Sequence, residues 1–224
     1  MTRTRFAFAV SLALFATAPA ALAADDDHSK VNGTVTIDAG ERAGDLDTVN
    51  GSIKIGASAR VGDAETVNGS IKVADQVRAG GLSTVNGSIR VGRNVEMGDD
   101  IGTVNGSIFV DRGGNIRGGV ETVNGAIGLV DTDVAGGIET VNGDLTVGAG
   151  SHVRGGIHYE KPNHQWLSFK TRDPKVIIGP NARVDGPLVF EHEVKLYVHE
   201  SARIGPVTGA TAIRYEGARA PTAE

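Results

Sequence analysis

Residues 48–91 read TVNGSIKIGASARVGDAE, TVNGSIKVADQVRAGGLS and TVNGSIRV in succession, so one segment returns at intervals of 18 residues. Across the chain the tripeptide Val-Asn-Gly occurs seven times, and successive copies lie 18 or 19 residues apart. The copies begin at Val31, Val49, Val67, Val85, Val104, Val123 and Val141. A fixed period of this kind indicates a repeat architecture, in which each unit forms one layer of a stacked array.

The pattern inside one unit favours β-strands. In Ile53, Lys54 and Ile55 apolar and polar residues alternate, and a period of two is typical of a strand. Gly56 and Gly62 separate the segments, as expected at bends. The unit is shorter than the roughly 30 residues of a βαβ crossover. Parallel stacking at about 4.8 Å would place each position on its counterpart in the next coil. We therefore expect Val to stack on Val and Ile on Ile in one continuous core.

The array extends beyond the last Val-Asn-Gly copy. The segments IGASARVGDA, VGAGSHVRGG, IGPNARVDGP and VHESARIGPV share a six-residue gap between apolar positions, and they begin at Ile55, Val147, Ile178 and Val198. We predict an all-β fold, a single-stranded parallel β-helix (β-solenoid) with 18–19 residues per coil. We expect about nine coils and a right-handed path, which is the usual hand of parallel crossovers.

The predicted organisation has six parts. They are a signal peptide (1–23), a short acidic lead (24–30), the Val-Asn-Gly solenoid (31–158), an inserted loop (159–175), C-terminal coils (176–214) and a flexible tail (215–224). The loop carries two prolines, several charges and the only tryptophan, Trp166. Insertions in repeat proteins leave the array as loops on one face.

The first 23 residues have the pattern of a secretory signal peptide. Arg3 and Arg5 precede the apolar run Phe6–Phe15, and Ala21, Leu22 and Ala23 form a small-residue cleavage site. We expect an exported protein, located in the periplasm, on the cell surface or outside the cell. No later segment approaches the about 20 apolar residues of a transmembrane helix.

Composition excludes several classes of site. The chain of 224 residues has 32 Gly but only 4% aromatic residues, which favours a thin core closed by many turns. It contains no Cys, so disulfides, thiolate metal sites and cysteine nucleophiles are excluded. The net charge is −5 and the isoelectric point is about 5.7, which argues against a general nucleic-acid binder.

Two known families resemble parts of the chain. The TVNGSI repeats resemble the Gly-rich β-strand-repeat family of adhesin-like proteins. The stretches VIIGPNARVDGPLVF (176–190) and VKLYVHESARIGPV (194–207) look like bactofilins, the polymer-forming cytoskeletal family. Both resemblances imply a right-handed parallel β-helix, and the second implies end-to-end filaments. Bactofilins are cytoplasmic or inner-membrane proteins, so the signal peptide departs from that family. Neither resemblance supplies a catalytic motif.

Two polar rows accompany the repeats. The Asn residues of the tripeptides are predicted to form a structural ladder of side-chain amides between coils. They are Asn32, Asn50, Asn68, Asn86, Asn105, Asn124 and Asn142. The preceding Thr residues are interpreted as strand formers in hydrogen-bonded pairs between coils.

A basic row supplies the main candidate for binding. Lys54, Lys72 and Arg90 share one repeat offset and should stack on one outer face. Such a face could dock an anionic polymer such as an acidic polysaccharide, or it could simply be solvated. Trp166 in the inserted loop is a second candidate contact, either as a glycan anchor or packed on the solenoid wall.

Acidic and histidine residues form weaker patterns. Asp47, Glu65, Glu121 and Glu139 share an offset, and the last two could form a carboxylate pair for acid–base chemistry or for a cation, but a convex solenoid face offers no cleft. His152, His158, His164, His192 and His199 match no compact metal-ligand motif. The sequence therefore predicts no catalytic residue, no cofactor and no metal site.

The leading functional hypothesis is a non-enzymatic, exported, structural or adhesin-like envelope protein that acts through its repetitive faces. One alternative is a self-assembling filament, because the end coils expose strand edges. Another is a polysaccharide-binding or polysaccharide-degrading β-helix protein, built on the inserted loop with Trp166, Arg172 and Asp173. The expected partners are the chain itself or an envelope polysaccharide, and no nucleic acid.

Overall fold

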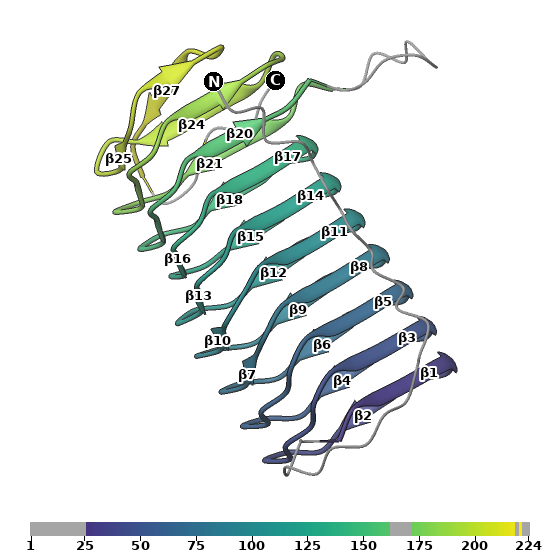
Figure 1. Cartoon of the computed structure of the whole chain (residues 1–224). Helices are drawn as coiled ribbons and strands as arrows, with labels where there is room; N and C mark the ends of the chain where they lie inside the picture. Colours follow the sequence, from purple (N-terminus) through teal and green to yellow (C-terminus); the bar gives the residue numbers. More distant parts are fainter. Residues whose placement is uncertain (1–25, 162–171, 218–219, 221–224) are drawn as a thin grey trace.

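The computed structural model describes residues 26–161, 172–217 and 220. Within these residues the chain is entirely β, with 27 strands in three parallel sheets and no helix. Each coil contributes strands to successive sheets, and the coils stack into one long solenoid (Figure 1). The predicted parallel β-solenoid of about nine coils is confirmed.

Sheet A has ten strands and faces one side of the solenoid. In stacking order they are β1 (His28–Asn32), β3 (Leu46–Asn50), β5 (Ala64–Asn68), β8 (Leu82–Asn86), β11 (Ile101–Asn105), β14 (Val120–Asn124), β17 (Ile138–Asn142), β20 (Ile157–Tyr159), β23 (Leu188–Phe190) and β26 (Val207–Thr208). Most of these strands have five residues, and the Asn-Gly turn follows at their ends.

Sheet B also has ten strands and follows the Asn-Gly turns. They are β2 (Val35–Ile37), β4 (Ile53–Ile55), β6 (Ile71–Val73), β9 (Ile89–Val91), β12 (Ile108–Val110), β15 (Ile127–Leu129), β18 (Leu145–Val147), β21 (Lys175–Ile178), β24 (Lys195–His199) and β27 (Ala212–Tyr215).

Sheet C closes the third side with short strands of two residues each. They are β7 (Arg78–Ala79), β10 (Glu96–Met97), β13 (Asn115–Ile116), β16 (Asp133–Val134), β19 (His152–Val153), β22 (Arg183–Val184) and β25 (Arg203–Ile204). Single parallel bridges from Arg42 to Arg60 and from Arg60 to Arg78 continue this side into the earlier coils.

The register places equal repeat positions directly on one another. Ile53 pairs with Ile71, and Ile71 pairs with Ile89, each in the adjacent strand of sheet B. All three side chains are fully buried, at 0–1% exposure. The predicted vertical stack of isoleucines around one narrow hydrophobic interior is therefore confirmed.

The predicted place of valine in the core is wrong for the Val-Asn-Gly tripeptide. In sheet A, Leu46 and Thr48 point inward and are buried, whereas Val49 is only half-buried on the outer face. The same phase recurs along the sheet, and Val31 at the first strand is 68% exposed. Alternation along the strand fixes this phase: once Leu46 is buried, the residue two positions on must also face inward.

The buried threonines are tolerated because each hydroxyl reaches a backbone carbonyl. Thr84 Oγ1 donates to the carbonyl of Gly69 in the preceding coil at 3.0 Å, and Thr103 Oγ1 donates to that of Gly87 at 3.1 Å. The hydroxyls therefore bond the Asn-Gly turn and not one another, which differs from the predicted Thr–Thr pairs. A buried polar group with a partner costs little, whereas one without a partner is destabilising.

Thr140 is the exception among these threonines. Its buried hydroxyl has no hydrogen-bond partner, although its register position is the same. In the next coil Tyr159 takes the threonine position, and its phenolic hydroxyl donates to the carbonyl of Gly143 at 3.0 Å. Tyr159 thus donates a hydrogen bond to the turn of the preceding coil, as Thr84 does, but from a larger side chain.

This difference predicts unequal effects on stability when either threonine is replaced by valine. Thr84→Val should lower the free energy of unfolding by about 1–3 kcal/mol, because it leaves the Gly69 carbonyl without its hydroxyl donor. Thr140→Val should be neutral or slightly stabilising, because that hydroxyl has no partner to lose. Urea unfolding followed by circular dichroism measures both, and equal losses would contradict the inward hydrogen bonds.

The outer limits of the solenoid differ slightly from those predicted. β1 begins at His28, inside the predicted lead, and β27 ends at Tyr215, a buried residue in the predicted tail. Tyr159 and Lys175, predicted to bound the inserted loop, are strand residues of β20 and β21. Because Ile157 pairs with Leu188, the stack continues across the insertion.

Three predictions fall on parts of the chain that are not described. The signal peptide (1–23), Trp166 and His164 lie outside the described residues. Within the described part, no helix has the length and apolar character needed to cross a membrane.

Candidate functional site

The Asn row is a continuous ladder along the corner between sheets A and B. Each amide nitrogen donates to the amide oxygen of the Asn one coil earlier, at 3.0 Å from Asn68 to Asn50 and 3.0 Å from Asn86 to Asn68. The other rungs join Asn50 to Asn32, Asn105 to Asn86, Asn124 to Asn105 and Asn142 to Asn124. Because the amides bond one another, the row acts as a structural spine.

The basic row predicted on sheet B forms one column. Lys54 pairs in register with Lys72, and Lys72 pairs with Arg90, with all three side chains exposed. Within the described residues no acidic side chain forms an ion pair with any of the three. The column ends where Phe109 takes the position, and the Arg90 guanidinium lies 5.8 Å from the centre of that ring. We call Lys54, Lys72 and Arg90 the sheet B basic column.

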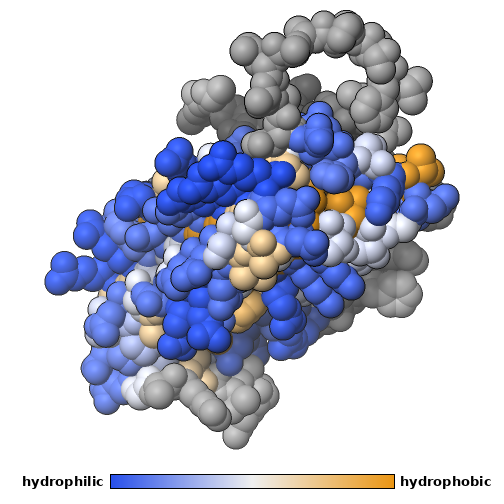
Figure 2. Space-filling view, turned by 90° about the horizontal axis from the view of Figure 1, so that it is seen from below, coloured by the Kyte–Doolittle hydropathy of each residue, from blue (hydrophilic) through white to orange (hydrophobic). Residues whose placement is uncertain are grey.

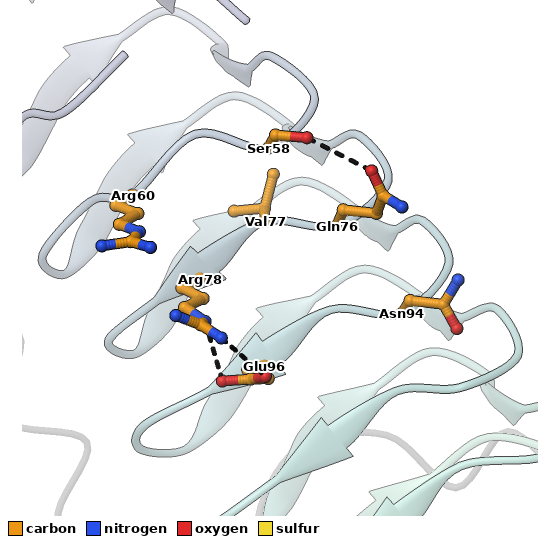
Figure 3. Close-up of a pocket in the computed structure, with 7 residues that line it drawn as sticks. All are labelled: Ser58, Arg60, Gln76, Val77, Arg78, Asn94 and Glu96. Carbon is orange, nitrogen blue, oxygen red and sulfur yellow. Dashed lines mark hydrogen bonds and ion pairs between the residues drawn. The ribbon is translucent and has the colours of Figure 1, made fainter. Parts of the chain in front are cut away.

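A second basic column lies on sheet C and was missed by sequence reasoning. Arg42, Arg60 and Arg78 are joined by parallel bridges and are exposed. Their 18-residue spacing was visible in the sequence, but the segment that carries them is too short to show strand alternation. Arg78 forms an ion pair with Glu96 in the next coil, with Nε and Oε2 2.9 Å apart (Figure 3). We call Arg42, Arg60 and Arg78 the sheet C basic column.

A hollow of about 300 Å³ lies beside this second column. It is lined by Ser58, Arg60, Gln76, Val77, Arg78, Asn94 and Glu96 (Figure 3). Ser58, Gln76 and Asn94 have left-handed backbone angles, with φ of 61°, 63° and 53°, and they form the bend between sheets B and C. Ser58 Oγ donates to Gln76 Oε1 at 3.2 Å, and the lining offers hydroxyl, amide and guanidinium groups for polar contacts.

The outer face of sheet A is acidic in its first coils. Asp47 and Glu65 are neighbours in register. Partial burial raises the pKa of Glu65 above its ordinary value, and the carboxylates of Asp47 and Asp63 raise it further. Burial raises the pKa of Asp47 in the same way, helped by Asp45. In the first coils, basic columns therefore lie on sheets B and C, and a row of carboxylates lies on sheet A.

The acidic row returns further along sheet A, where Glu121 pairs in register with Glu139. Partial burial and the adjacent Glu139 carboxylate raise the pKa of Glu121 to about 7. Glu139 pairs in turn with His158 of β20. Glu139, His158 and Glu160 each offer one potential metal-ligand atom, and these atoms lie within 4.8 Å of one another.

Of the other histidines singled out in the sequence, His152 and His199 lie on sheets C and B, whereas the His192 ring lies 5.9 Å from the ring of Tyr159, beside this cluster. His152 is on sheet C, where Nε2 is 2.8 Å from Asp185 Oδ2 and Nδ1 is 3.6 Å from Asp133 Oδ1. The hydrogen bond from His152, together with one from Arg183, lowers the pKa of Asp185. His192 Nε2 lies 2.9 Å from the Val141 carbonyl oxygen, and His199 Nδ1 lies 2.8 Å from Ser201 Oγ. These histidines therefore do not form a common site.

The surface seen from below is mostly hydrophilic, with only small hydrophobic patches (Figure 2). Comparison of the chain with protein-family models, curated proteins and solved structures gave no match. The resemblances to the adhesin-like repeat family and to bactofilins therefore stay predictions, and the functional argument depends on the geometry of the faces.

Proposed function

We propose that this protein is a non-catalytic binding scaffold of the cell envelope, and that its first coils hold a linear anionic polymer such as an acidic polysaccharide. The observation that carries the proposal is the pair of basic columns on adjacent sides of the first coils, which overlap in the coils of β4 and β6. Export, implied by the signal peptide, would place the protein where such polymers occur.

The columns favour an anionic partner for an electrostatic reason. Like charges that face one another across paired strands destabilise a sheet, and stacking at about 4.8 Å brings them close. The sheet B basic column has no acidic partner within the described residues, so its repulsion is uncompensated in the free protein. A bound polyanion would remove that repulsion on contact.

A polymer fits the arrangement better than a small ligand. Equivalent side chains recur along the solenoid axis, so a linear chain with regularly spaced carboxylates could contact several coils at once. The hollow beside Arg60 and Arg78 adds amide and hydroxyl groups that can bond sugar hydroxyls. Charged faces of this type also steer anions toward the surface, in a manner that salt suppresses.

The test compares two triple variants with the same loss of charge. Lys54→Gln, Lys72→Gln and Arg90→Gln together should weaken binding to polygalacturonate roughly tenfold, at about 0.5 kcal/mol for each exposed charge. The matched control carries Arg117→Gln, Arg154→Gln and Arg203→Gln, three exposed positions away from that column. Isothermal titration calorimetry at low and high salt, with neutral dextran as a second probe, measures the difference.

Equal affinity of the two triple variants would contradict the assignment of the surface, and binding to dextran as strong as to polygalacturonate would contradict an electrostatic partner.

End-to-end self-association is a second candidate, supported by the edges of β1 and β2, which pair only with β3 and β4 among the described strands. Sedimentation of the same samples would show only monomers if that candidate is wrong.

A further inference from the structure

The coil of β20 breaks the repeat at two positions on the outer face of sheet A. His158 pairs in register with Glu139 and so replaces an acidic residue of the row. Glu160 follows Tyr159, the register partner of Thr140, and so takes the position that Val141 has one coil earlier. Both changes bring metal-ligating groups to the same place, beside a carboxylate that the repeat already supplies.

We propose that Glu139, His158 and Glu160 form a binding site for a first-row divalent metal ion, with Zn²⁺ as the best match. One imidazole nitrogen and two carboxylate oxygens are a donor set that suits Zn²⁺, with water in the remaining position. Imidazole argues against Mg²⁺ and Ca²⁺, which prefer oxygen ligands alone.

The distances between the three ligand atoms are compatible with a shared metal ion. The three ligand atoms lie within 4.8 Å of one another. Around a tetrahedral Zn²⁺ with bonds of about 2.0–2.1 Å, ligand atoms are roughly 3.3 Å apart. Glu139 and Glu160 are half-buried, and rotation of their side chains can close this difference without moving the strands. The site stays open to solvent on its outer side.

Glu191 completes the arrangement from the following coil. Its Oε1 lies 3.4 Å from His158 Nε2, and its Oε2 accepts a hydrogen bond from the Lys161 backbone at 3.1 Å. If Nε2 donates its proton to Glu191, Nδ1 keeps the lone pair that a metal needs. A carboxylate that holds the second ring nitrogen is the usual support of a metal-bound histidine. Glu191 is therefore a positioning residue.

The negative charge of the carboxylates near His158 also favours a bound cation. Glu139, Glu160 and Glu191 lie around the His158 imidazole, and Glu121 is the register neighbour of Glu139 in the preceding coil. Within residues 26–161 and 172–217 no Lys or Arg side chain forms an ion pair with Glu121, Glu139 or Glu160. The Glu139 and Glu191 carboxylates repel the Glu160 carboxylate. A divalent ion would offset this repulsion and join β17 to β20, just before the inserted segment.

The experiment titrates the untagged, metal-free protein with ZnCl₂ by calorimetry, with MnCl₂ and MgCl₂ as further arms. We expect saturable Zn²⁺ binding that His158→Gln or Glu160→Gln weakens at least tenfold. Glu191→Gln should weaken it about tenfold, as loss of a supporting carboxylate does. Zn²⁺ should also raise the melting temperature of the wild-type protein, because it binds only the folded state.

Two controls keep the result specific. His152→Gln removes the other histidine that lies between carboxylates, and Glu65→Gln removes a carboxylate from the same face five coils away from β20 in stacking order. Both should retain wild-type Zn²⁺ affinity. The proposal is overturned if the wild-type protein does not bind Zn²⁺, if Mg²⁺ binds as tightly, or if binding survives both His158→Gln and Glu160→Gln. Circular dichroism of each metal-free variant confirms that it is folded.

Discussion

Gly87→Ala should destabilise the solenoid by about 3 kcal/mol or more, the upper range for forced overpacking. A Cβ atom at this position would lie 1.8 Å from the Gly69 carbonyl oxygen and 2.5 Å from its carbonyl carbon. Both are backbone atoms of the preceding coil, so no side chain can move aside. Relief requires the two coils to separate at the Asn-Gly turn, where the Asn ladder and the Thr84 hydroxyl bond hold them together.

Gly98→Ala is the matched control for this prediction. A Cβ atom there would meet nothing nearer than the Ala79 carbonyl oxygen at 3.5 Å, which is an ordinary contact. We expect a change within about 0.5 kcal/mol, as for most surface substitutions. The two variants are compared by urea unfolding and by melting temperature. Similar stability of Gly87→Ala and Gly98→Ala would mean that the coils do not approach so closely at the turn.

Ile89→Ala should lower the free energy of unfolding by about 2–5 kcal/mol, as expected for a large side chain removed from a core. Ile89 is 1% exposed and lies between Ile71 and Ile108 in the stack, so its removal leaves a cavity that neighbouring coils cannot fill. The stacked neighbours are fixed by strand pairing on both sides, which limits collapse around the gap.

Val85→Ala, four residues earlier, should cost only about 1 kcal/mol or less, because the side chain is half-exposed on the outer face. This pair of variants tests the phase of sheet A, since a core valine would lose nearly as much as Ile89. The measurement is the midpoint of chemical unfolding for each single variant. Equal losses would show that the valines, and not the threonines, face the interior.

The period of the repeat could be predicted from the sequence because strand pairing between coils requires equal positions to recur. The inward direction of Ile53, Ile71 and Ile89 followed from strict alternation in short segments. Hydrophobicity could not show which residues of the sheet A strands face the interior, because Thr48 is buried and Val49 is only half-buried. A hydroxyl that finds a carbonyl is as acceptable inside as a methyl group, and only the turn geometry shows that the carbonyl is there.

The candidate sites also divide into those that could be predicted from the sequence and those that could not. The sheet B basic column was predictable, since Lys54, Lys72 and Arg90 repeat at a fixed offset. The sheet C basic column repeats equally regularly, but Arg42 and Arg60 form isolated bridges and Arg78 lies in a two-residue strand, so alternation cannot reveal it. The cluster at His158 was missed because Glu139 and Glu160 belong to different rows, and adjacent rows meet only once the register is known.

By itself the sequence determined that this protein is a stack of parallel coils, because only a repeated unit can bury apolar residues that no single unit can bury alone. Tertiary structure decided which side of each strand faces inward, where the chain bends between sheets, and which charged residues become neighbours. The physical reason is that periodicity states how often a position returns, whereas contact between different positions depends on the turn angles and on hydrogen bonds between coils.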